Sequence, residues 1–580
     1  MLFSYLAHRR ACLDKRRERE ERIASLPQAY HEPLSPQDKR LLSQPISSII
    51  HAVQTSSLSP VDVLLAYGKR TIQAQAQTNC LTEVMIGEAE KWAHTAIRSG
   101  PLAGVPVSLK DMIAVKGYDS SLGYSAFTNA PVSNDAPIVR LLHDAGAIPY
   151  VKTNVPITLL SYESANDVFG VTENPHKKGY SPGGSSGGES ALLAFGGSRI
   201  GIGSDIAGSV RVPAHYSGIY AIKSSTQRFP KSGNAASGPG QDGVAGSHSP
   251  MAKTLEDLET FWRAVLQMKP WEYDHSVINL PWRKVQLPQD RPIRWGVLWD
   301  DGVVAPSPAC LRALKMVTEV LAKHGHEIVT LNSPCPYEGL QIASQFLFAD
   351  GGKFFSKPFH SFETNSAGMV PALRATRLPR FIMKIYAWYL RYIRRDPIYA
   401  GLVENFHAKT VEEYCKLIVQ REDYRTRWFR VWRGVQARDS LGDNGIDFIL
   451  TVPNALPAVP HGGMRHGWKA CGYAILFNLL DYSAGVMPIT RSFRARNAVE
   501  RNNYRMYDAE AMDGLPVGVQ VVGRRLDEER VLESMKLIYR LMADAGLAYQ
   551  VYVCVVYIQI ISLVFHDKES GRNELSKSTT

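Results

Sequence analysis

The 580-residue sequence has only seven cysteines, and they are scattered along the whole chain. Their number is odd, no Cys-x-x-Cys pair occurs, and no group of histidines and cysteines has the spacing of metal ligands. These absences argue against a disulfide scaffold and against a zinc module. We therefore expect reduced thiols in an intracellular, cytoplasmic protein that needs no metal.

Phosphate-binding loops are also missing. The sequence contains no Gly-Lys-Ser/Thr, with which a Walker loop ends. Gly201 and Gly203 are followed by Ile206 at the position where a dinucleotide fingerprint has its third glycine. We expect no cofactor.

Long apolar runs are scarce. Residues 1–10 contain an apolar stretch too short for a signal peptide, and its charges follow it instead of preceding it. Residues 545–566 form a run of 22 without Asp, Glu, Lys or Arg. A helix of that length would just span a bilayer core of about 30 Å, but its valines, isoleucines and tyrosines suit strands. A gene-model artefact, a tail anchor and a buried or swapped strand stay open, in this order of preference.

Positive charge exceeds negative charge by 11. Many of the cations lie in two blocks, residues 9–22 and 374–395, which favours attraction to anionic surfaces. No nucleic-acid motif accompanies them, so we expect no nucleic-acid partner. Residues 8–25 are predicted to form a solvated helix, and residues 33–61, rich in Pro and Ser, an irregular arm with one short helix.

Helical and extended segments alternate along most of the chain, which is typical of an α/β protein. Strands are predicted over residues 102–107, 147–152, 293–298, 327–331, 447–452 and 516–522. Helices are predicted over residues 88–98, 135–145, 254–268, 310–324, 473–480 and 528–545, and residues 341–440 are predicted to be mainly helical.

Residues 181–209 are dominated by glycine and serine, with a helix-compatible stretch at 189–195. A linker would explain the composition, but apolar residues at near-alternate spacing from Ile200 to Val212 indicate a strand and a buried turn. Gly183 to Gly187 also matches the G-x-S-x-G nucleophile elbow, which needs a strand directly before it. Residues 174–182 make a poor strand. An esterase with Ser185 as nucleophile and His461 or His466 as base is therefore the alternative interpretation.

The stretch as a whole resembles the amidase signature family. Gly-Gly-Ser-Ser-Gly-Gly is present, its first serine is Ser185, and Ser209 follows in Gly-Ser-Asp-Ile-Ala-Gly-Ser. Lys110, in Val-Ser-Leu-Lys-Asp, matches the upstream lysine of the family. The resemblance covers most of residues 65–545 and is strongest to fungal acetamidases and fatty acid amide hydrolases. It implies an α/β fold with one large domain, in which helices cover both faces of a twisted mixed β-sheet.

The resemblance also implies a reaction: hydrolysis of a carboxylic amide, fatty acyl amides included, without histidine. Ser209 is the implied nucleophile and forms an acyl-enzyme, Ser185 the bridge on a cis Gly184–Ser185 peptide bond, and Lys110 the base. Lys110 must then have a lowered pKa, which burial supplies. An amidotransferase subunit of the same fold is a further alternative, which the basic, hydrophobic segment at 374–395 disfavours.

Further site residues follow from the same resemblance. Ala207 departs from the commoner glycine and implies a φ angle that a Cβ tolerates. The expected substrate-binding residues, which include the backbone N–H groups of an oxyanion hole, are Leu159, Ser185, Ile206, Ala207, Gly208 and Ser209. The expected supporting residues are Ser186, Ser204 and Arg211.

The predicted organisation is an arm (residues 1–64), a catalytic domain (65–545) with its core at about 100–225 and a helical cap at about 341–440, and an apolar tail (546–580). In the cap, seven cations and no acidic residue lie between residues 374 and 395. An aromatic and apolar helical face is predicted there, made of Phe381, Ile385, Trp388, Tyr389 and Tyr392. It predicts either a core-facing helix or an interfacial helix on anionic lipid, and hence peripheral membrane attachment. The expected partner is a small-molecule amide, and a homodimer stays open.

Overall fold

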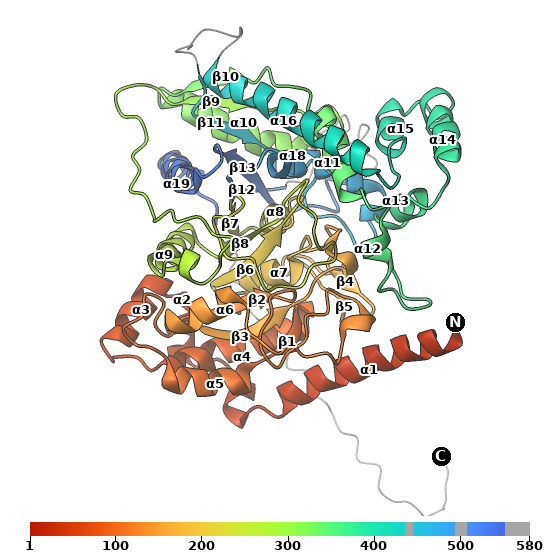
Figure 1. The fold of residues 1–580 in the computed structure, drawn as a ribbon. Helices are drawn as coiled ribbons and strands as arrows, with labels where there is room; N and C mark the ends of the chain where they lie inside the picture. Colours follow the sequence, from red (N-terminus) through yellow and green to blue (C-terminus); the bar gives the residue numbers. More distant parts are fainter. Residues whose placement is uncertain (435–444, 493–506, 551–580) are drawn as a thin grey trace, which may run out of the picture.

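One mixed sheet of eleven strands organises the protein (Figure 1). The computed structural model describes residues 1–434, 445–492 and 507–550. In spatial order, the strands are β1 (Leu81–Val84), β3 (Ile148–Thr153), β2 (Pro106–Lys110), β6 (Ile200–Asp205), β8 (Ser247–Ala252), β7 (Tyr220–Lys223), β12 (Ala484–Arg491), β13 (Pro516–Val522), β11 (Phe448–Thr451), β9 (Arg294–Val297) and β10 (Glu327–Thr330). A two-stranded hairpin, β4 (Ala165–Asn166) and β5 (Gly170–Val171), lies apart from it.

Strand direction changes across the sheet. β3, β2 and β6 are mutually parallel, as are β11, β9 and β10. The strands between these groups pair antiparallel, and β1 pairs antiparallel with β3. The predicted mixed α/β sheet is therefore confirmed.

Helices cover both faces of the sheet. They include α7 (Gly187–Phe195), α8 (Arg211–Ser217), α9 (Leu255–Gln267), α10 (Pro308–Lys323), α18 (Gly472–Leu479) and α19 (Glu528–Asp544). Gly485 of β12 pairs with Val521 and faces Met535 of α19, whereas Gly518 of β13 faces His215 of α8. Residues 518 and 521 point to opposite faces because side chains alternate along a strand, so α8 and α19 lie on opposite sides.

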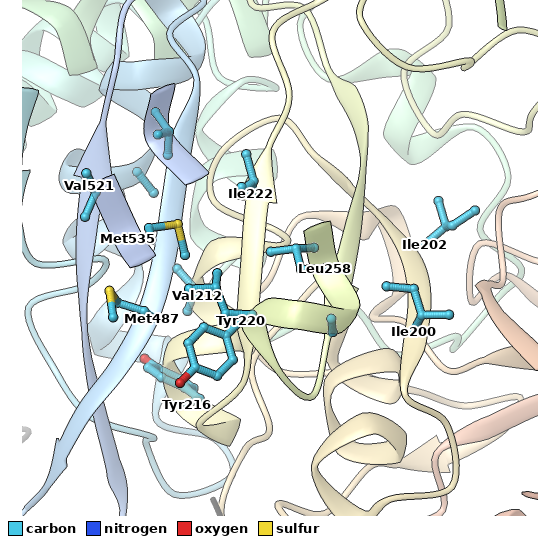
Figure 2. Close-up of a cluster of buried hydrophobic side chains, with 14 of the residues drawn as sticks. Ile200, Ile202, Val212, Tyr216, Tyr220, Ile222, Leu258, Met487, Val521 and Met535 are labelled. Atoms are coloured by element: carbon cyan, nitrogen blue, oxygen red, sulfur yellow. The ribbon is translucent and has the colours of Figure 1, made fainter. Parts of the chain in front are cut away.

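A large buried cluster fills the space between the sheet and these helices. Figure 2 shows a part of it in which Ile222 and Tyr220 of β7 lie between Ile202 of β6 and Val521 of β13. Burial of apolar surface on this scale, at about 25 cal/mol per Å², is the main force that holds the strands in register. The strand that carries Lys110 and the strand that leads to Ser209 are paired neighbours in this sheet.

The N-terminal region is more regular than predicted. It comprises α1 (Leu2–Ala24), the 3-10 turn η1 (Gln28–His31), α2 (Pro36–Ser43), α3 (Ile46–Gln54), α4 (Pro60–Thr78), α5 (Ile86–Thr95), η2 (Ser125–Phe127), α6 (Pro137–Asp144) and η3 (Ile157–Leu159). The prediction of a single short helix over residues 33–61 is wrong, because Pro36 and Pro45 each occupy a helix start, where a missing N–H costs nothing. Residues 102–104, predicted as strand, form turns before β2.

The helix α1 is only partly solvated, so that prediction also needs correction. Lys15 is 2% exposed and lies between the carboxylates of Glu83 (2.5 Å) and Asp119 (2.8 Å). Arg19 donates to the carbonyl of Leu81 at 2.7 Å. One charged face of α1 therefore packs against the edge of the sheet at β1.

Helices dominate residues 336–433, which lie to one side of the sheet (Figure 1). They are α11 (Pro336–Leu347), α12 (Lys353–Ser356), α13 (Val370–Ala375), α14 (Arg380–Tyr392), α15 (Pro397–Val403) and α16 (Val411–Arg433), and after β11 come α17 (Met464–Gly467) and the 3-10 turn η5 (Trp468–Cys471). A capping box of Thr410 and Glu413 starts α16, and Gly434 with φ of 63° ends it. Residues 435–440 of the predicted cap are outside the described residues.

The chain after residue 550, which carries most of the apolar run at 545–566, is outside the described residues, so the interpretations of that run stay predictions. None of the helices in the described ranges has the length and hydropathy needed to cross a bilayer.

Candidate active site

Lys110 is the last residue of β2, and its side chain is fully buried. Its Nζ lies 2.7 Å from Ser185 Oγ and 2.8 Å from Ser204 Oγ, with the carbonyl oxygen of Ser204 at 3.4 Å. Three oxygen atoms therefore surround Lys110 Nζ, which is buried and shielded from water. The structure thus brings together Lys110, Ser185 and Ser204.

Burial changes the proton affinity of this lysine. Desolvation lowers the pKa of Lys110 to about 7, while the carboxylates of Asp205, Asp111 and Glu189 oppose the shift without cancelling it. Near neutral pH, a large share of the side chain is therefore a neutral amine that can accept a proton.

Ser185 lies in the glycine-rich segment between β5 and α7, and the Gly184–Ser185 peptide bond is cis, as the resemblance implied. Side chains are not tolerated at its glycines. A Cβ on Gly184 would lie 2.3 Å from the carbonyl oxygen of Ser161, and a Cβ on Gly188 2.2 Å from the nitrogen of Asn154. The glycines therefore allow close backbone approach and do not act as a flexible linker.

Ser209 follows β6 in a short loop that turns into α8. The N–H of Ser186 donates to the carbonyl of Ser209 at 3.1 Å, which joins the two serine-bearing segments. The near-alternate apolar spacing from Ile200 to Val212 predicted a strand and a buried turn, and the strand is β6, which ends at Asp205. Val212 belongs to α8, whose first residue is Arg211.

Asp205, the last residue of β6, organises the loop. Its carboxylate accepts the N–H groups of Gly208 (2.8 Å) and Val210 (3.1 Å) and the guanidinium of Arg211 at 2.9 and 3.1 Å. Burial alone would raise the pKa of Asp205, but Arg211 holds it well below its usual range. Arg211 also donates to Asn478 (2.6 Å) and Gln520 (2.7 Å), so it braces the loop against α18 and β13.

The predicted oxyanion hole needs one revision. Because the Gly208 N–H is already bound to Asp205, it is not available to a substrate oxygen. Gly208 has a φ of 105°, whereas Ala207 is not among the residues with positive φ, in agreement with the expectation for its Cβ. Ile206, Ala207 and Ser209 remain as candidate donors.

Two cavities meet at Ser209. One, of about 110 Å³, is lined by apolar side chains of the core and of the helices at 336–433, including Met369, Ala372, Leu402 and Phe406. The other, of about 520 Å³, is lined by Ser185, Ser209 and residues 231–242. One side of the nucleophile candidate is therefore apolar and the other is more polar.

Leu159 borders both cavities. Its φ is 60° and that of Thr158 is 69°, a conformation that residues with a side chain rarely adopt. Such strain persists only where the surroundings enforce it and is common at ligand sites. The position of Leu159 is consistent with its predicted contact to substrate.

Other site residues escaped the sequence analysis. The hydroxyl of Tyr162 donates to the carbonyl of Ala207. The buried carboxylate of Glu189, on α7, accepts from the hydroxyls of Ser108 and Thr153, and its pKa is raised to about 7 by burial. Asp205 lies inside the recognised motif and could have been singled out, but Tyr162 and Glu189 carry no local signal.

The elbow alternative lacks its structural context. No strand lies between β5 and α7 in this described part of the chain. His461 Nε2 contacts Glu173 at 3.1 Å, and neither cavity at Ser209 includes His461 in its lining. The side chain of His466 is outside the described set.

Comparisons with known proteins agree with this geometry. The family model described as Amidase matches residues 62–532. "Fatty-acid amide hydrolase 1" of Sus scrofa is 34% identical over 517 residues, covering 87% of this chain and 86% of the relative. "Acetamidase" of Emericella nidulans is 32% identical over 539 residues, covering 88% and 91%. A solved structure titled "Fatty acid amide hydrolase" superposes with a TM-score of 0.77 at 26% identity, covering 94% of this chain and 97% of that chain.

Proposed function

This chain belongs to the amidase family and is a hydrolase of amide carbon–nitrogen bonds, and from that premise we propose that Ser209, Ser185 and Lys110 carry out its reaction. The observation that carries the proposal is the buried Lys110 amine, 2.7 Å from Ser185 Oγ, with a pKa lowered to about 7. A base with a pKa near the working pH combines the correct protonation state with enough basicity.

In the acylation half-reaction, Ser209 Oγ attacks the carbonyl carbon of the amide. The Ser209 proton passes to Ser185, and the Ser185 proton passes to Lys110. We expect the N–H groups of Ile206, Ala207 and Ser209 to stabilise the negative oxygen of the tetrahedral intermediate. When that intermediate collapses, the proton returns from Lys110 through Ser185 to the nitrogen, and the amine or ammonia leaves.

In the deacylation half-reaction, water attacks the acyl-enzyme ester. Lys110, neutral again, takes the water proton through Ser185 and returns it to Ser209 Oγ as the ester bond breaks. The products are a carboxylate and the restored enzyme. Arg211 and Asp205 hold the loop in place but exchange no proton with substrate, and Ser186 and Ser204 support Ser185 and Lys110.

We assign the apolar cavity to the acyl chain and the polar cavity to the leaving group. The apolar cavity runs from Ser209 to Met369 and Ala372, in or next to α13. This supports a fatty acyl amide as substrate, because a chain of methylene groups gains about 0.8 kcal/mol for each CH₂ it buries. Similarity to proteins named fatty acid amide hydrolase points the same way.

The outer face of α14 supports docking on a membrane. Phe381, Ile385 and Tyr392 are 64, 62 and 60% exposed, and Trp388 and Tyr389 accompany them. The core-facing interpretation of this face is therefore wrong: Met383, Ala387 and Leu390 form the buried side of α14. Several exposed cations near this face make no ion pair with the acidic residues that the structure describes. These cations are Arg374, Arg377, Lys384, Arg394 and Arg395. Aromatic groups beside such cations suit an anionic lipid surface.

The test of the catalytic assignment is covalent labelling with a fluorophosphonate probe together with amide hydrolysis. Ser209→Ala should abolish the label and lower kcat by at least about 10³-fold. The exposed Ser57 provides a control, Ser57→Ala, that should match the wild type. A label that persists in Ser209→Ala and maps to Ser185 would establish the elbow mechanism instead.

A further inference from the structure

Three side chains with metal-ligating atoms meet outside the two cavities at Ser209, between the N-terminal helix and the segment that leads to α13. They are His8 on α1 and His360 and Glu363 after α12, and one ligand atom from each lies within 4.8 Å of the others. His8 Nδ1 is 3.8 Å from Glu363 Oε1. The Nδ1 atoms of His8 and His360 both face Ser125 Oγ, at 2.9 and 2.8 Å.

The side chains of His8 and Glu363 are buried and that of His360 is half-buried, and the cluster has an excess of negative charge. The side chain of Glu363 is 0% exposed and that of His8 is 8% exposed. The Glu363 carboxylate accepts the N–H groups of Ser125 (2.7 Å) and His360 (2.9 Å). Within the described ranges, its ion-pair partner is His8, and no Lys or Arg pairs with it. Burying an ionised carboxylate without a full counter-charge is costly, so the site favours a cation.

A second carboxylate fixes the orientation of His8. Asp167 Oδ2 lies 3.3 Å from His8 Nε2 and also accepts the N–H of Thr364 at 2.6 Å. Metal-binding histidines usually donate their second ring N–H to a carboxylate in this manner, which directs the other nitrogen to the metal. Here the other nitrogen is the Nδ1 that faces Glu363.

We propose that His8, His360 and Glu363 bind one Zn²⁺, with the Ser125 hydroxyl or a water molecule as fourth ligand. Two imidazoles and a carboxylate are ligands that zinc prefers, whereas Ca²⁺ and Mg²⁺ prefer oxygen alone. Ligand atoms of tetrahedral zinc lie about 3.3 Å apart, so the ligand atoms, which lie within 4.8 Å of one another with His8 Nδ1 and Glu363 Oε1 at 3.8 Å, must move closer together when zinc binds. We expected no metal from the sequence, where His8 lies far from His360 and Glu363 and the three residues form no recognisable ligand motif.

The site is structural and not catalytic. None of its three ligands lines either cavity at Ser209. Its ligands connect α1 to the segment that continues into α13, which borders the apolar cavity. Bound zinc would therefore fasten the N-terminal helix to the base of the cap and leave the amide chemistry to Lys110, Ser185 and Ser209.

Zinc titration of the untagged, full-length, EDTA-treated protein by calorimetry tests the proposal, with Co²⁺ absorption as a second readout. The wild type should bind one equivalent and give the visible spectrum of tetrahedral cobalt. Glu363→Gln, which retains a hydrogen-bond acceptor and is expected to fold, should lose the spectrum. Asp167→Asn should weaken the affinity about 10- to 100-fold, and His51→Ala, at an exposed histidine, should match the wild type.

Two results would overturn the proposal. Absence of binding to the wild type at micromolar zinc would mean that the hydrogen bonds within the cluster satisfy its carboxylates without a metal. Binding of equal affinity in the wild type, Glu363→Gln and His8→Asn would place the zinc elsewhere on the chain. Circular dichroism of each variant confirms folding before titration.

Discussion

At the scale of single residues, Lys110 shows how burial lowers the proton affinity of a common side chain. Its Nζ is bonded to two hydroxyl oxygens and one carbonyl, so its hydrogen bonds are satisfied without a carboxylate in contact. Direct ion pairing would have held the pKa high and kept the amine protonated. The described contacts instead leave desolvation as the largest influence on the pKa.

This arrangement predicts a specific pH dependence. Because the reaction needs the neutral amine, kcat/KM should increase as the pH rises through about 7 and then level off. Lys110→Ala should lose this inflection and run about 10²- to 10⁴-fold slower at pH 7, with partial recovery at high pH where hydroxide replaces the base. Steady-state kinetics across pH provide the measurement, with the exposed Lys116→Ala as control. Wild-type rates in Lys110→Ala at every pH would exclude Lys110 as the base.

At the scale of elements, α1 is held to the sheet by buried charge and not by an apolar stripe. Lys15 contacts Glu83 and Asp119, and Arg22 also pairs with Glu83. These buried ion pairs stabilise the protein only while every partner is present. Removal of one charge leaves its partner unpaired in the interior, which is strongly unfavourable.

Removal of the Lys15 charge should therefore destabilise the protein. Lys15→Met keeps most of the volume but leaves the buried carboxylates with less positive charge, and should lower the free energy of unfolding by about 3 kcal/mol. Lys91→Met breaks an exposed pair with Glu88 and should cost less than about 1 kcal/mol. Urea denaturation compares the two. Equal effects of both substitutions would mean that the α1 ion cluster contributes little.

The helix α14 allows a matching experiment on membrane binding. The double variant Phe381→Asp, Trp388→Asp should not sediment with anionic liposomes, because two charges would replace the aromatic groups that enter the lipid interface. The wild type should sediment, and less so as salt increases. Val419→Asp, Phe429→Asp makes the same charge change on exposed positions of α16 and should behave like the wild type. Equal binding of both double variants would place the lipid contact elsewhere.

At the scale of the whole molecule, the apolar cavity at Ser209, which we propose holds the acyl chain, extends from the sheet core to the helices at 336–433. Ala372 of α13 lies on its cap side. Ala372→Phe should fill part of a cavity of about 110 Å³ and lower kcat/KM for a long-chain amide at least about 10-fold. The rate on acetamide, whose acyl group needs little of the cavity, should stay unchanged. An equal loss on both substrates would indicate a general defect in place of a chain-length effect.

The sequence could predict what short-range patterns encode. Helices and strands followed from apolar periodicity and turn residues, and Ser185, Ser209 and Lys110 followed from a recognised motif. Contacts between distant segments could not be predicted in this way. The bonds of Arg211 to Asn478 and Gln520, the pairing of Lys15 with Asp119, and the meeting of His8 with Glu363 all depend on tertiary packing, which local sequence does not reveal.

The two cavities at Ser209 also bear on the order in which products leave. A leaving amine on the polar side departs while the acyl group is still bonded to Ser209 and occupies the apolar side. The carboxylate is then the last product released, and it returns to the same free enzyme that the substrate binds. Carboxylate product should accordingly compete with substrate, whereas amine product should not, and a strong nucleophile such as hydroxylamine should divert the acyl group before water reaches it.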